Sequence, residues 1–86
     1  MEPRELIELR AGTPVAAGSI TVIPVEARRI RVRAEGDRLF AHAAQHPYAF
    51  VIRNGDQAHA IDARGAPLDL DDLRARVAGL APHLRR

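Results

Sequence analysis

Charged and aliphatic residues alternate one by one through the segment Arg29-Ile30-Arg31-Val32-Arg33, which is the clearest pattern in this sequence. Successive side chains of a β-strand point to opposite faces, so the alternation predicts a strand over residues 28–34. The cationic face of this strand carries Arg29, Arg31 and Arg33. The opposite face, which we predict to be buried, carries Ile30, Val32 and Ala34.

Other stretches also favour extended structure. Residues Ile20 to Val25 are rich in β-branched side chains and apolar on both sides, which predicts a strand covered on both faces. A brief strand is expected at residues 15–17. Asn54-Gly55 separates the apolar run 48–53 from residues 57–62, and such a dipeptide between two strand-forming runs predicts a β-hairpin.

Two segments have helical signals. Asp69 is placed to cap a helix spanning Pro67 to Gly79, in which Leu70, Leu73 and Val77 form one apolar stripe. At the other end of the chain, Glu2 to Arg10 predicts a short helix with proline in its first turn.

The segment 37–45 has two interpretations. Asp37 can cap a helix with apolar residues on one side, or Arg38 to His42 can continue a hairpin across Gly36. The alanine content favours the helix, and the short Glu-Gly-Asp connection favours the hairpin. In either case His46-Pro47 is expected to end the element.

These elements predict a single α+β domain over residues 1–86. It has a small antiparallel sheet of four to five strands, with short N-terminal and C-terminal helices. The chain has 86 residues and its hydrophobic content is 47%, but 16 of those apolar residues are alanine, so the core must be small. With no cysteine, no disulfide can compensate. We therefore expect association into a homo-oligomer.

The charge balance is close to neutral. Thirteen arginines face eleven acidic residues, for a formal net charge of +2, which disfavours a nucleic-acid partner. No apolar run is long enough to span a membrane, and the charged N-terminus lacks the apolar region of a signal peptide. A cytoplasmic protein without membrane association is therefore expected.

Histidines suggest one candidate metal site. If residues 37–45 are helical, His42 and His46 share a helix face at the spacing of a two-histidine clamp. His59 or Asp62 could supply the third ligand that zinc requires. The alternative is that these are surface histidines flanking a turn.

The arginine ladder at positions 29, 31 and 33 suggests a second candidate, a weak nucleic-acid or acidic-partner site. Charged residues are also common on the solvated face of a sheet, where a cross-strand carboxylate can neutralise them. Aromatic side chains that would stack on single-stranded bases are almost absent. No cysteine nucleophile, paired catalytic acids or phosphate-binding loop is recognisable, so we expect no enzymatic activity and no cofactor.

One family resemblance exists. Gly12-Thr13-Pro14-Val15, Gly18, and Thr21-Val22-Ile23-Pro24-Val25 resemble the opening of GerW-like sporulation domains, and residues 47–55 resemble that family's second apolar strand and its turn. The resemblance implies a small β-rich domain without catalytic residues. The glycine-rich segment of the family is reduced here to Gly36, and the helix after Asp69 has no counterpart.

The sequence thus favours a non-enzymatic, self-associating binding or accessory module that can also take a protein partner. We expect its interface to use Tyr48, Phe50 and Ile52, with the three ladder arginines as a charged rim.

Overall fold

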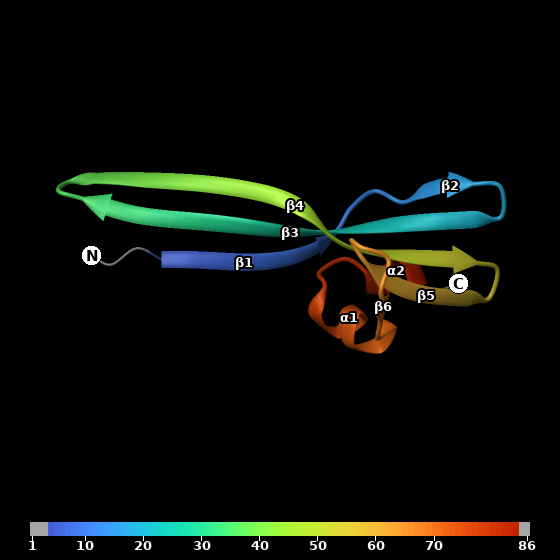
Figure 1. Cartoon of the computed structure of the whole chain (residues 1–86). Helices are drawn as coiled ribbons and strands as arrows, with labels where there is room; N and C mark the ends of the chain where they lie inside the picture. Colours follow the sequence, from blue (N-terminus) through green and yellow to red (C-terminus); the bar gives the residue numbers. More distant parts are fainter. Residues whose placement is uncertain (1–3, 85–86) are drawn as a thin grey trace.

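The computed structural model describes residues 4–84, which form one antiparallel sheet and two short helices (Figure 1). The elements in chain order are β1 (Arg4–Ala11), β2 (Val15–Ala17), β3 (Ile20–Glu35), β4 (Arg38–Asn54), β5 (Gln57–Asp62), β6 (Pro67–Leu68), α1 (Leu70–Arg76) and α2 (Ala81–Leu84). Strands run in the order β1-β3-β4-β5-β6, and β2 pairs with β3 as well. The fold is therefore α+β in a broad sense and consists mainly of sheet, with six strands in the described chain instead of the predicted four to five.

Two long strands organise the molecule. β3 and β4 have 16 and 17 residues and pair along their whole length. Their distal halves, residues 26–35 and 38–47, form with β1 a three-stranded projection that we call the arm. The remaining elements form the head (Figure 1). The chain measures 55 × 24 × 21 Å, and its radius of gyration of 16.1 Å exceeds the ~12 Å of a compact domain of this length.

Three hairpin turns share one local design. Each has two loop residues and begins with glycine, in the pairs Gly18-Ser19, Gly36-Asp37 and Gly55-Asp56. Those glycines have φ of 61°, 64° and 60°, the left-handed value that a type II′ turn places at its first position. The hairpin predicted at Asn54-Gly55 is therefore confirmed, although the loop residues are Gly55 and Asp56.

The N-terminal segment is a strand, so the helix predicted over Glu2 to Arg10 is wrong within the described residues. Residues 4–11 pair antiparallel with β3 from Arg4↔Val32 to Ala11↔Val25. A helix of nine residues cannot hold itself together, whereas the long edge of β3 offers a complete ladder of backbone hydrogen bonds. Residues 2 and 3 lie outside the described part of the chain.

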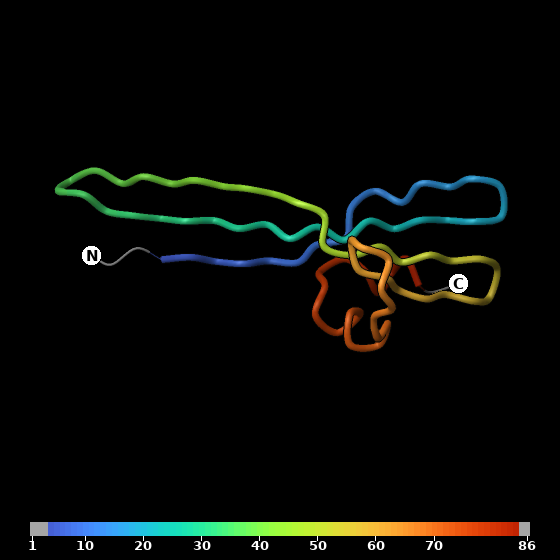
Figure 2. Tube along the Cα trace, viewed as in Figure 1, coloured from blue at the N-terminus to red at the C-terminus, as the bar shows by residue number. Residues whose placement is uncertain are grey.

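The ambiguous segment 37–45 is also extended, in agreement with the hairpin interpretation. Pro47, expected to end this element, lies inside β4, where a bulge accommodates it. Val25 pairs with Ala49 and Glu26 with Pro47, so Tyr48 is an extra residue on β4. Proline cannot donate a hydrogen bond to the ladder and is therefore tolerated at a bulge. The Cα trace of β4 bends sharply there (Figure 2).

The core lies in the head, between one face of the sheet and the C-terminal segment. Its buried residues are Ile23, Val25, Ala49, Val51, Ala60, Leu73, Val77 and Leu80. Both helices cover this face alone (Figure 1). The strand Ile20–Val25, expected to be covered on both faces, is covered on one, since Ile23 is 1% exposed while Ile20 is 39% exposed.

The predicted C-terminal helix is confirmed over its central part. Asp69 caps it by accepting hydrogen bonds from the backbone N–H groups of Asp71 and Asp72, at 2.9 and 3.2 Å. Leu73 and Val77 are buried, as the apolar stripe predicts. The helix is shorter than expected at both ends. Residues 67–68 pair with β5 instead, and beyond Arg76 the chain is extended, so that Ala78 forms backbone hydrogen bonds with β1.

Asp62 fastens the turn that leads from β5 to β6. Its Oδ1 accepts hydrogen bonds from the backbone N–H of Arg64 at 2.8 Å and of Ala66 at 2.9 Å. Both hydrogen bonds lower the pKa of the Asp62 carboxyl below its usual 3.8, and the bond from Ala66 has the larger effect.

A carboxyl with a lowered folded-state pKa stabilises the fold above its unfolded-state pKa and loses that contribution as pH falls through the folded-state value. Asp62→Asn is therefore expected to unfold at lower urea concentration than the wild type at pH 7. The gap should narrow progressively below pH 3.8. Urea titrations between pH 7 and pH 2 measure this, and a gap that stays constant over that range would contradict the role given to the carboxylate.

Candidate interaction surfaces

The three ladder arginines project from one face of the arm, as the alternation predicts. We call this side the arginine face. In the register of the sheet, Arg29 stands beside Ala44, Arg31 beside His42 and Arg33 beside Phe40. The face continues the side of β3 that carries Ile23 and Val25 in the head. The same strand side is thus packed in the head and charged in the arm.

Glu5 of β1 neutralises part of this charge. Its carboxylate lies 3.3 Å from Nε of Arg29 and accepts a hydrogen bond from Nε of Arg31 at 3.0 Å. Nε of Arg29 is buried and not aligned for a hydrogen bond, so its link to Glu5 is an ion pair only. Glu35 lies 3.8 Å from Arg33. One carboxylate between two guanidinium groups leaves the middle of the face cationic.

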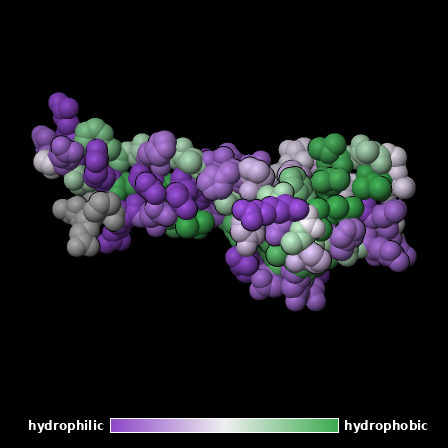
Figure 3. All heavy atoms as spheres, viewed as in Figure 1, coloured by the Kyte–Doolittle hydropathy of each residue, from purple (hydrophilic) through white to green (hydrophobic). Residues whose placement is uncertain are grey.

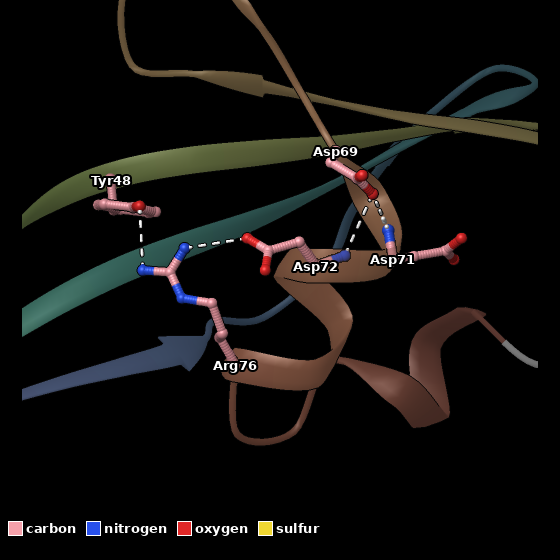
Figure 4. A network of polar contacts seen from close by, with 5 residues as sticks. All are labelled: Tyr48, Asp69, Asp71, Asp72 and Arg76. Atoms are coloured by element: carbon pink, nitrogen blue, oxygen red, sulfur yellow. Dashed lines mark hydrogen bonds and ion pairs between the residues drawn. The ribbon is translucent and has the colours of Figure 1, made fainter.

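A groove of about 550 Å³ marks the junction of arm and head on this face. It is lined by Ile7, Leu9, Ala27, Arg29, His46, Tyr48 and Arg76. Arg76 of α1 holds the head side of the groove in place, because it donates hydrogen bonds to Asp72 at 3.2 Å and to the Tyr48 hydroxyl at 3.4 Å (Figure 4). These two hydrogen bonds raise the pKa of the Arg76 guanidinium, and the bond to Tyr48 has the larger effect.

A second hollow, of about 510 Å³, lies further out on the arm, and we call it the distal hollow. It is lined by Arg31, Arg33, Phe40, Ala41 and His42. The Arg33 guanidinium lies over the Phe40 ring, 5.2 Å from its centroid. This cation–π contact places the positive charge of Arg33, a residue of β3, above β4.

The opposite side of the sheet is apolar at both ends, and in the described chain neither helix lies on it (Figure 1). We call it the open face. Its arm patch consists of Leu6, Ile30, Val32, Ala34, Leu39, Ala41 and Ala43. Its head patch consists of Val15, Ile20, Val22, Pro24, Phe50, Ile52 and Ile61. Hydrophobic side chains gather over β2 and the adjoining end of β3 (Figure 3).

Exposure confirms that the open face is accessible to solvent. Leu6 is 57% exposed, Val15 62% and Leu39 73%. Ile30, Val32 and Ala34 are half-buried, so the prediction that they face a dry interior is wrong within residues 4–84, where no second layer covers the arm. Large exposed apolar surfaces of this kind are typical of interaction sites.

A polar band divides the open face. It consists of Glu8, Arg10, Glu26, Arg28 and Gln45. Arg10 lies 3.5 Å from Glu8, and Gln45 donates a hydrogen bond to Glu26. The band contains two acids and two bases, so it is neutral as a whole.

The structure does not bring the candidate metal ligands together. His42 and His46 are four residues apart on an extended strand, about 13 Å along one face, instead of adjacent on a helix. His59 pairs with Ile52 and so belongs to the open face. Within residues 4–84, no group of three histidine, cysteine or acidic side chains is placed to hold a metal ion.

The predicted interface residues are divided between the two sides. Phe50 and Ile52 belong to the open face. Tyr48 is the bulge residue and packs against the core and Arg76. The ladder arginines project from the opposite side and cannot form the rim of the Phe50 surface. An extra residue in β4 decides this, and alternation alone cannot reveal it.

Sequence reasoning also missed the outer edge of β4 in the arm. β4 pairs with β5 only from Ala49 to Asn54, so the edge at residues 38–47 has no neighbouring strand within the described chain. One signal was available: from Leu39 to Ile52 the sequence contains no Asp, Glu, Lys or Arg.

None of the described helices is long and apolar enough to cross a membrane. No protein-family profile, characterised protein or solved structure matches this chain significantly.

Proposed function

We propose that this chain is a non-enzymatic binding module that self-associates through its open face. The observation that carries the proposal is a sheet whose one face is packed in the head, while the other is apolar at both ends and uncovered within the described residues. An antiparallel sheet normally keeps its uncovered face polar, so two apolar patches on that face call for a second layer. Within the described residues the arm has no core of its own, and a few strands without one are marginally stable.

A second copy supplies that layer with matching chemistry. Consider two copies with their open faces in contact, related by a two-fold axis that lies between the sheets, perpendicular to β3 and level with position 27. The strands of the two copies then run in opposite directions, and Glu26 of one copy faces Arg28 of the other. Ile30 then faces Pro24, and Val32 faces Val22. The arm patch of each copy thus covers the head patch of its partner, and the polar band meets itself with opposite charges paired. Such self-complementarity is what an isologous interface requires.

The size of the surface supports the same partner. At about 3.3 Å per residue, the 16 residues of β3 extend for ~50 Å, and three strands have a width of ~14 Å. Each copy would contribute ~700 Å² of sheet, or ~1,400 Å² in total. Stable interfaces bury about 1,200–2,000 Å².

The dimer would present its two arginine faces outward, on opposite sides of the sandwich. Each would keep its groove and its distal hollow accessible. This arrangement supports a role as a bivalent binding or accessory module, whose function is to hold partners in place.

Sedimentation equilibrium of the wild-type protein tests the proposal. We expect a mass of twice the 9.4 kDa of one chain at micromolar concentration. Because apolar contact dominates the interface, the mass should persist at high salt, which screens charge pairs but not apolar burial. A monomer at high micromolar concentration would exclude self-association.

A further inference from the structure

The outer edge of β4 in the arm is a surface distinct from the open face. We propose that residues 38–47 bind an extended acidic segment of a partner protein, which adds to the sheet as a further strand. Added strands of this kind bind by main-chain hydrogen bonds, and side chains at alternate positions provide specificity.

The two edges of the arm differ in their protection. β1 carries Arg4, Glu5, Glu8 and Arg10, and charged side chains discourage strand addition. Its end is also closed, since Ala78 accepts from Ala11 N–H at 3.0 Å and donates to Leu9 C=O at 3.1 Å. The β4 edge has no neighbouring strand within residues 4–84 and, after Arg38, no charged residue to guard it.

The chemistry beside this edge favours an anionic strand. The distal hollow places Arg31, Arg33 and His42 next to it. The Arg33 guanidinium lies over the Phe40 ring, so its charge is placed above the edge strand β4 itself. A carboxylate in the hollow would meet these donors directly.

The register defines the alternation that such a ligand needs. Side chains on one side of the added strand would lie beside Phe40, His42 and the arginines, and those on the other side beside Ala41 and Ala43. A fitting segment therefore alternates acidic and small apolar residues. A second copy of β4 fits less well, because it brings no carboxylate and places two arginine faces on the same side.

A fluorescein-labelled heptapeptide of alternating Glu and Val is the probe, and fluorescence anisotropy with the wild-type protein is the measurement. We expect saturable binding that Arg33→Glu weakens by at least about tenfold. Arg4→Glu makes the same charge change on the open face of the arm and should alter the Kd by less than about twofold. A peptide with Lys at the Glu positions should not bind.

Three outcomes would overturn the proposal: absence of binding, equal binding of the Lys peptide, or equal binding of a Glu peptide whose central Val is replaced by Pro. The last would show charge attraction without strand addition, because proline interrupts the ladder. The edge and the open face are separate surfaces, so the Phe50→Glu variant should bind the peptide as the wild type does. Peptide binding by the Phe50→Glu variant therefore tests strand addition alone, whereas the mass of the wild-type protein tests self-association.

Discussion

Phe50→Glu is expected to convert the dimer into a monomer, with a dissociation constant raised by about a thousandfold. Phe50 lies at the centre of the head patch, between Pro24 of β3 and Ile61 of β5. In the proposed dimer, the partner's arm patch would bury a carboxylate at this position without a counter-ion. The two-fold axis repeats that penalty, and central aromatic positions contribute about 2 kcal/mol or more each.

Sedimentation equilibrium of the variant measures this effect, and circular dichroism checks that the fold is retained. Phe50 faces away from the core formed by its neighbours Ala49 and Val51, so the monomer should keep its sheet. Ala75→Glu, on the exposed side of α1, is the matched control and should leave the mass unchanged. If Phe50→Glu sediments as the wild type does, the open face is not the interface.

Leu73→Ala is expected to lower the free energy of unfolding by about 3 kcal/mol, because it removes a fully packed side chain and leaves a cavity. Leu73 is 2% exposed. Three of the nine buried hydrophobic residues are alanines, so only a few large side chains stabilise the core. In a domain of this size such a loss corresponds to a fall in Tm of at least about 10 °C.

Leu39→Ala provides the comparison, since the same atoms are removed from a side chain that is 73% exposed at the tip of the arm. Both substitutions should be measured in the Phe50→Glu background, where dimerisation does not contribute. There Leu39→Ala should change stability by less than about 0.5 kcal/mol. Equal effects of the two substitutions would mean that the arm and the head share one core.

The candidate sites were only partly predictable from sequence. The alternation from Arg29 to Arg33 correctly placed three cations on one face. Of the residues assigned to one interface, Phe50 and Ile52 lie on the open face, whereas Tyr48 packs against the core. The histidine site depended on a helix at residues 37–45, and that helix does not form. The β4 edge was missed, because an edge exists only relative to a neighbour that ends early, here β5 at its pairing with Ala49.

The features that the sequence determined by itself are those that depend on local interactions. The glycine turns, the helix capped by Asp69 and the alternating strand all depend on residues a few positions apart, and all are present. The tertiary structure alone decided the rest. Residues 4–11 became a strand because β3 offered them a ladder. Tyr48 reversed the alternation of β4 by bulging, and the C-terminal helices covered only one of two apolar sheet faces. Each of these depends on contacts between distant segments, whose free energies no local pattern contains.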